Sequence, residues 1–111
     1  MHEPLTAAEY KAIAANLHLP TNAFIDGAFR PARSGKTFTS TNPATGEALA
    51  EIAACDASDV DDAVAKARQA FDDGRWRLLA PGDRKAALLK LARLIEDNRH
   101  ELAVMESLDS G

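Results

Sequence analysis

Residues 23–30, Ala-Phe-Ile-Asp-Gly-Ala-Phe-Arg, place the dipeptide Asp26-Gly27 between two short apolar runs. A two-residue turn with positive φ at both central positions favours Asp-Gly, so this pattern predicts a tight β-hairpin. A second pair of strands is predicted further along, over residues 36–41 and 48–53, with a stretch dense in turn residues between them. Two hairpins alone make a marginal sheet, and they need a partner surface.

A helical pattern precedes the first hairpin. Residues Thr6-Ala7-Ala8-Glu9 have the form of a capping box, in which the hydroxyl and the carboxylate satisfy free N–H groups at a helix start. Apolar side chains follow at helical spacing, so a short amphipathic helix is expected over residues 6–17. Pro20 is expected to end it.

Helical patterns also follow the second hairpin. Asp56 or Ser58 can cap a helix that carries one apolar stripe and ends at Gly74. Pro81 suits the first position of the next helix. An interruption is expected at residues 98–100, followed by a last helix over residues 101–108 that stops at 109–111. The stripe of the first of these helices comprises Val60, Ala63, Val64, Ala67 and Phe71.

The composition restricts the classes of function. The chain has 111 residues and a net charge of −4, and nearly half of its apolar residues are alanine, which leaves few large side chains for a core. The acidic balance without a basic cluster argues against nucleic acid as a partner, and no stretch is long enough for a membrane span. The start, Met1-His2-Glu3-Pro4, lacks the features of a signal peptide, so a cytoplasmic protein is expected. A single cysteine fits a reducing compartment.

Few residues in the sequence are candidates for catalysis, metal binding or phosphate binding. Cys55 stands between a predicted strand and a predicted helix, but a nucleophile also needs a base, and no motif brings His2, His18 or His100 to it. We therefore interpret Cys55 as structural. The sequence contains no zinc-ligand spacing. Residues 34–37, Ser-Gly-Lys-Thr, lack the first glycine and the following helix of a phosphate loop, so they are interpreted as a turn.

An acidic run marks the start of the first downstream helix. The run lacks the central glycine and terminal glutamate of a helix–loop–helix calcium site. A helix cap followed by a solvated face explains it better. Its members are Asp56, Asp59, Asp61 and Asp62.

Several short motifs share a characteristic order along residues 23–111. They are Phe24-Ile25-Asp26-Gly27, Thr41-Asn42-Pro43-Ala44-Thr45-Gly46-Glu47, Ala63-Val64-x-x-Ala67-Arg68-x-Ala70-Phe71, Trp76, Arg84, Leu91-Ala92-x-Leu94-Ile95-Glu96 and Glu101-Leu102-Ala103-x-x-Glu106-Ser107-Leu108-Asp109-x-Gly111. In order and spacing, this set resembles the N-terminal portion of the NAD(P)-dependent aldehyde dehydrogenase superfamily. The first twenty residues resemble the extension of the branch that acts on 4-(γ-glutamylamino)butyraldehyde and related aminoaldehydes.

The resemblance implies an α/β enzyme of which this chain holds only a part. Residues 1–20 would be an N-terminal helical extension, residues 21–55 a β-hairpin region, and residues 56–111 the helical part of a truncated NAD-binding domain. The two hairpins and the helices would form the outer layer of this incomplete dinucleotide-binding domain. The complete enzyme would oxidise an aldehyde to a carboxylate with NAD or NADP and would form a homo-oligomer. No residue here matches the family's catalytic Cys, catalytic Glu or dinucleotide loop, so the chain alone is expected to be inactive.

One site of the family does map onto this sequence. Many members hold a structural Na⁺ or K⁺ ion, and the matching positions are Ser40, Thr41 and Asp109. Oxygen donors of this kind suit a hard cation. The alternative is that Asp109 is an exposed acid at a helix end. The sequence departs from the family pattern at Ala80, which stands where a Ser or Thr cap is expected before Pro81, so the start of that helix is expected to fray.

Two alternatives to the interpretation of this chain as part of an enzyme remain at this point. The chain could be a truncated, non-catalytic helical domain that associates with a full-length partner. It could also be an independent acidic adaptor, which would leave the ordered motifs as coincidence. Neither the aldehyde nor the choice between NAD and NADP follows from the sequence.

Overall fold

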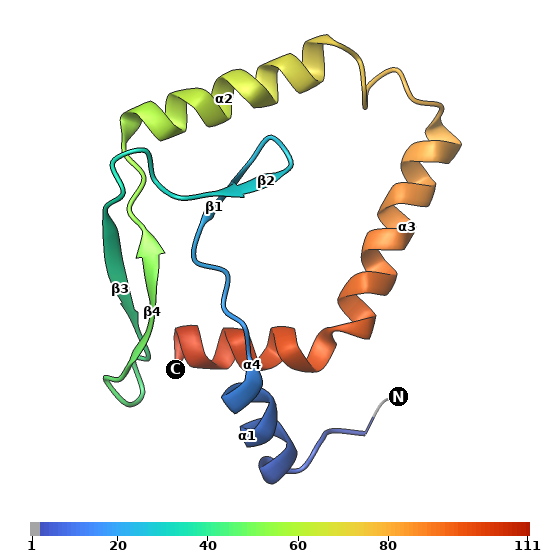
Figure 1. Cartoon of the computed structure of the whole chain (residues 1–111). Coiled ribbons are helices and arrows are strands. Elements are labelled where there is room, and N and C mark those ends of the chain that lie inside the picture. The colour runs from blue at the N-terminus through green and yellow to red at the C-terminus, as the bar shows by residue number, and fades with distance from the viewer. Residues whose placement is uncertain (1–2) are drawn as a thin grey trace.

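The computed structural model describes residues 3–111, in which four helices and two hairpins follow the outline of an open ring (Figure 1). Helices α2, α3 and α4 and the β3–β4 pair trace the ring, the β1–β2 hairpin lies within its outline, and α1 extends outward beside α4. The elements in chain order are α1 (Ala7–Asn16), β1 (Ala23–Ile25), β2 (Ala28–Arg30), β3 (Thr37–Thr41), β4 (Ala48–Ala53), α2 (Ala57–Asp72), α3 (Pro81–Asp97) and α4 (Arg99–Ser110).

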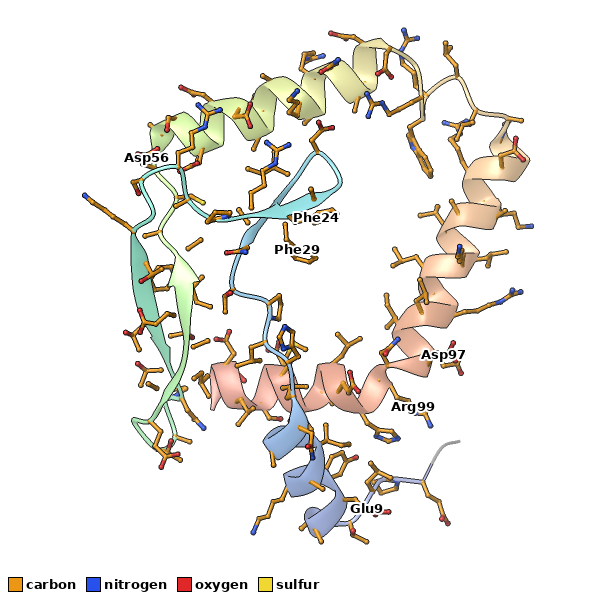
Figure 2. The ribbon with its side chains drawn as sticks, in the orientation of Figure 1. Glu9, Phe24, Phe29, Asp56, Asp97 and Arg99 are labelled. Atoms are coloured by element: carbon orange, nitrogen blue, oxygen red, sulfur yellow. The ribbon has the colours of Figure 1, made fainter. Side chains whose placement is uncertain are left out.

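The first hairpin confirms the prediction made from Asp-Gly. Strands β1 and β2 pair antiparallel, with Phe24 opposite Phe29. Asp26 has φ 53° and Gly27 has φ 74°, as a turn with two positive φ angles requires. The two phenylalanine rings lie 5.0 Å apart between centroids and point away from the hairpin into the ring outline (Figure 2). The hairpin therefore presents two aromatic side chains that it does not bury.

The second hairpin contains an irregularity that bears on the candidate site. Strands β3 and β4 pair antiparallel, and β4 has the predicted bounds. Strand β3 begins one residue later than predicted, since Lys36 contributes only its carbonyl, which accepts a hydrogen bond from the amide of Ala54. Ser40 pairs with Ala50, whereas Thr41 pairs with Ala48. Leu49 is thus an extra residue on β4, which bends the strand at that point.

The capping box of α1 forms as the sequence predicts, and α2 has a capping box where only a cap is predicted. At α1, the amide of Glu9 donates to the Thr6 hydroxyl at 3.3 Å, and the amide of Thr6 donates to the Glu9 carboxylate at 2.8 Å. At α2, the cap is Asp56 and not Ser58, because the Asp56 carboxylate accepts from the amides of Ser58 and Asp59. Asp59 in turn accepts from the Asp56 amide at 3.0 Å.

The boundary between α3 and α4 is narrower than predicted. A single residue, Asn98, separates the two helices, and α4 runs from Arg99 to Ser110. The side-chain amide of Asn98 donates to the Leu94 carbonyl at 2.8 Å and ends α3. The Asn98 carbonyl then accepts from Leu102, so the next helix begins at once. Ala80 makes no side-chain cap at the start of α3, as expected, and the fraying of that start stays a prediction.

The described chain has almost no core of its own. Among residues 3–111, the buried apolar residues are Ala32 and Val104. A compact chain of this length has a radius of gyration of about 13 Å, whereas this one has 17.7 Å. A compact protein of this mass exposes about 5,900 Å², whereas this chain exposes 8430 Å². No helix in the described part is long and apolar enough to cross a membrane.

Candidate functional site

An open pocket of about 340 Å³ lies where the end of α4 meets β3 and β4. Ser40 and Asp109, two of the three predicted cation ligands, both line it, whereas Thr41 is not among its lining residues. The other lining residues are Leu19, Pro20, Leu49, Ala50, Ile52, Leu102, Met105, Glu106 and Leu108. The structure therefore brings together two positions that are far apart in the sequence.

Local backbone features place these two residues. The register irregularity lies between Ser40 and Thr41, and the extra residue on β4, Leu49, lines the pocket together with Ser40. On the other side, Gly111 has φ +78°, and a Cβ atom on it would lie 3.0 Å from Cγ of Pro43. The Asn-Pro turn and the end of α4 are thus in close contact, which brings two of the sequence motifs side by side.

The Asn-Pro turn is itself held rigidly. Asn42 is buried, its side-chain oxygen accepts a hydrogen bond from the amide of Ala44 at 2.9 Å, and its own amide donates to the Glu47 carbonyl. A side-chain oxygen that bonds the backbone two residues on is a turn-forming arrangement. The turn that contacts the end of α4 is therefore closed by its own hydrogen bonds.

The polar side chains among the residues that line the pocket carry oxygen atoms. They are Ser40, with a hydroxyl group, and Asp109 and Glu106, with carboxylates, and the other lining residues are apolar. Such donors fit a hard cation in kind. They do not form a cluster of three or more metal-binding side chains, and residues 3–111 contain no such cluster elsewhere.

The cysteine and the histidines lie apart in the fold as described. Cys55 is exposed in the short link between β4 and α2. His18 follows α1, and the ring of His100 on α4 packs edge-on against Tyr10, 5.9 Å between centroids. His2 lies outside the described residues. The structural interpretation of Cys55 stays a prediction.

Two acidic residues at the start of α2 make contacts that the predicted cap and solvated face do not include. Asp59 is buried, and its carboxylate accepts a hydrogen bond from the amide of Arg33 at 3.1 Å. Asp62, one turn further, pairs with Arg30 at 3.2 Å and with Arg33 at 3.5 Å. The spacing could have indicated this, because both the two acids and the two arginines are three residues apart. The interpretation as a cap with a solvated face was therefore incomplete.

Hydrogen bonds to the carboxylates lower the pKa of several acids at helix ends. The pKa of Asp56 is lowered first by the Ser58 hydroxyl and then by the amides of Asp59 and Ser58. The pKa of Glu9 is lowered mainly by the amide of Thr6. Arg75 lowers the pKa of Asp73 in the turn after α2. These shifts belong to caps and turns, so they mark structure and not a catalytic group.

Comparisons with known proteins agree on one family. The sequence pattern described as "Aldehyde dehydrogenase family" matches residues 29–111. Aminoacetaldehyde dehydrogenase of Pseudomonas aeruginosa is 67% identical over 111 residues, which are 100% of this chain and 22% of that protein.

Solved structures give the same result. A γ-glutamyl-γ-aminobutyraldehyde dehydrogenase from Burkholderia cenocepacia is 46% identical with a TM-score of 0.90 over 94% of this chain and 21% of its own. An indole-3-acetaldehyde dehydrogenase of P. syringae, solved with NAD⁺, is 46% identical with a TM-score of 0.90 over 95% of this chain and 21% of its own. The chain thus spans about a fifth of the length of these relatives.

Proposed function

The chain belongs to the aldehyde dehydrogenase family, and we propose that it forms the N-terminal part of an NAD-dependent enzyme that oxidises an aldehyde to a carboxylate. The observation that carries this proposal is the 67% identity to an aminoacetaldehyde dehydrogenase over the whole chain. The large exposed surface and the near absence of a core support it, because such a segment is stable only against a larger body.

In the complete enzyme, NAD would accept the hydride of the aldehyde when bound. The residues of this chain would not touch the reacting atoms. They would form the outer layer that supports the dinucleotide-binding sheet, with residues 1–20 as an extension, 21–55 as the hairpin region and 56–111 as the helical part of the domain. The separate chain would therefore be inactive.

We further propose that the substrate is an aminoaldehyde. Two relatives carry such substrates in their names, aminoacetaldehyde and γ-glutamyl-γ-aminobutyraldehyde. A third is named for indole-3-acetaldehyde at the same 46% identity, so the comparison of substrates has to be made on the complete protein. We also place the enzyme in the cytoplasm and expect it to be a homo-oligomer.

A monovalent cation, Na⁺ or K⁺, is proposed at the end of α4. Asp109 and Ser40 would contribute oxygens from the pocket described above, and Thr41 would contribute from the neighbouring end of β3. These residues suit a monovalent cation because they carry oxygen donors. The remaining oxygen ligands would have to come from residues packed against this segment. The role of the ion would be structural, because it would tie β3 to α4.

The deciding experiment is an assay of the complete protein that carries these residues. We expect NADH to form only when aldehyde is present, with a higher kcat/KM for aminoacetaldehyde than for indole-3-acetaldehyde. The 111-residue chain alone should form none. Aldehyde-dependent NADH from the separate chain would contradict the proposal, as would a complete protein that oxidises no aldehyde.

A further inference from the structure

Charged residues connect the β1–β2 hairpin and the loop after it with helix α2, which lies alongside (Figure 1). Lys66 pairs with Asp26 in the hairpin turn at 3.8 Å. Asp62 pairs with Arg30 at 3.2 Å and with Arg33 at 3.5 Å. The last contact is the hydrogen bond from the Arg33 amide to the Asp59 carboxylate. We call this set the charge ladder, and its members are Asp26, Arg30, Arg33, Asp59, Asp62 and Lys66.

The charges of the ladder follow a fixed order on both sides. On α2, positions 59, 62 and 66 are three and four residues apart, so they share one face of the helix. Positions 33, 30 and 26 meet them in that order. The helix therefore presents two acids and then a lysine, and the hairpin segment presents two arginines and then an acid. The sign changes at the same step on both sides.

A shift of α2 by one turn would destroy this match. Packed elements can move past each other by one helical turn, about 5.4 Å. A shift in one direction would bring Lys66 to Arg30, and a shift in the other would bring Asp62 to Asp26. Both shifts place like charges together, and such repulsion is a general means of excluding a wrong arrangement.

The apolar contact between the same two elements does not select a register. Ala63, Ala67 and Ala70 on α2 line an open pocket of about 370 Å³ together with Phe24 and Ile25 of the hairpin. The three alanines are identical and lie about one turn apart, so a shift by one turn replaces one alanine by the next. Selection between registers therefore has to come from the charges.

The ladder is a connected network and not a set of isolated pairs. Arg30 contacts Asp26 at 3.9 Å as well as Asp62, and Asp62 contacts two arginines. The Asp62 side chain is 20% exposed, so its ion pairs are partly shielded from solvent. Isolated ion pairs at the surface contribute little to stability, whereas networks contribute more.

We propose that the charge ladder is a register lock, which selects one position of the β1–β2 hairpin along α2 and holds the hairpin there. All of its members lie within this chain. The lock is therefore independent of the proposed function, and it is tested without an assay of activity.

Cross-linking in the complete protein that carries these residues measures the register. Ile25→Cys is combined in turn with Ala63→Cys, Ala67→Cys and Ala70→Cys, and Cys55→Ser removes the exposed thiol beside α2. A short bifunctional thiol reagent then links the pairs across the pocket, and peptide mass spectrometry measures each rate. We expect one pair to react about two- to fivefold faster than the other two, which corresponds to the energy of surface ion pairs.

Neutral variants show whether the charges cause this preference. Asp26→Asn with Asp62→Asn neutralises the ladder and keeps the turn, because Asn-Gly also favours it. The three rates should then become equal. Asp61→Asn with Asp72→Asn removes two acids of α2 that lie outside the ladder and should leave the preference unchanged. A preference that survives neutralisation of the ladder would overturn the proposal, as would equal rates in the natural ladder.

Hydrogen exchange of the complete protein gives a second measurement. Lys66→Glu places an acid against Asp26, and we expect the amides of residues 23–30 to exchange about two- to fivefold faster. Asp26→Asn should speed this exchange in the natural protein and slow it in the Lys66→Glu variant. The same change in both backgrounds would overturn the proposal, because a purely local effect of Asp26→Asn does not depend on residue 66. Peptides from β3 and β4 serve as the internal reference.

Discussion

The carboxylate of Asp59 connects the start of α2 to the backbone of Arg33, twenty-six residues earlier in the chain. One oxygen accepts from the Arg33 amide at 3.1 Å, and the other accepts from the Asp56 amide at 3.0 Å. Asp59 is 5% exposed. A buried carboxylate is tolerated only when its oxygens are hydrogen-bonded, and here both are. This residue therefore holds the loop after β2 against the first turn of α2.

Replacing Asp59 should destabilise the protein. Asp59→Ala leaves two N–H groups without their acceptor at a buried position, and the expected cost is about 1–3 kcal/mol. Asp61→Ala, on the exposed side of the same turn, is the matched control and should change stability little. Thermal or urea unfolding of the two variants, each made in the complete protein that carries these residues, measures the difference. Equal stability of both would show that the Asp59 contacts are not formed.

Gly74 lies two residues after Asp72, the last residue of α2, and should not tolerate a side chain. Its φ is +79°, and a Cβ atom there would overlap the side chain of Leu78. Gly74→Ala is expected to cost roughly 1–2 kcal/mol from the backbone conformation alone, plus the overlap. Gly82→Ala is the control, because Gly82 lies inside α3 with open space around it. That change should stabilise the protein by about 0.4–1 kcal/mol, and both effects are read from unfolding curves of the complete protein.

The cap of α2 should weaken in acid. Hydrogen bonds to the Asp56 carboxylate lower its pKa in the folded chain. A lowered folded pKa means that the stabilisation is fully present above the unfolded value of about 3.9 and is lost as the pH falls through the folded pKa. Protection of the amides at the start of α2, measured as the exchange rate relative to the unfolded chain at the same pH, should therefore fall as the pH drops below about 3.9. Asp56→Ala should remove this pH dependence, and an unchanged profile in the variant would contradict the role of Asp56.

If the proposed cation binds, the stability of the complete enzyme should depend on which monovalent cation is present in solution. Exchanging Na⁺ or K⁺ for a large organic cation should lower the unfolding temperature, because β3 and α4 would lose a shared ligand. Asp109→Asn should abolish the difference between the salts. Glu3→Gln, an exposed acid outside the pocket, serves as the control for removing one charge. A salt response that survives Asp109→Asn would place the ion elsewhere.

Cys55 should be dispensable for catalysis. It is exposed between β4 and α2, and the proposed function assigns it no role. Cys55→Ser in the complete enzyme is expected to leave kcat and KM for the aldehyde unchanged. A loss of kcat greater than about tenfold, equivalent to 1.4 kcal/mol, would show that the structural interpretation of Cys55 is wrong.

Much of the secondary structure could be predicted because its signals are local. The Asp26-Gly27 turn, the Thr6 capping box and the start of α3 at Pro81 each depend on a few adjacent residues. The family, too, could be recognised from the order of its motifs. The break at Asn98 was predicted too long, because a single side chain can end one helix while its own carbonyl begins the next.

The candidate site was predictable only in part. Ser40 and Asp109 were expected together, and they line one pocket, but their meeting depends on the strand irregularity and on the close approach of Gly111 to Pro43. The role of Asp59 was missed, because an acidic residue at the start of a helix is usually interpreted as a cap. Nothing in the local pattern distinguishes a capping acid from one that also binds a distant loop.

The sequence by itself thus determined the elements and the family, since turns, caps and helical periodicity arise from interactions over four residues or fewer. Tertiary structure alone decided which faces are used. On α2 it directed the alanines to the hairpin and left Val60 and Val64 open, and it buried Asp59 while leaving Asp61 exposed. The physical reason is that the burial of a side chain depends on the segment that packs against it as well as on the residue itself. A periodic pattern in the sequence shows that a helix has an apolar face, but it does not show which segment covers that face.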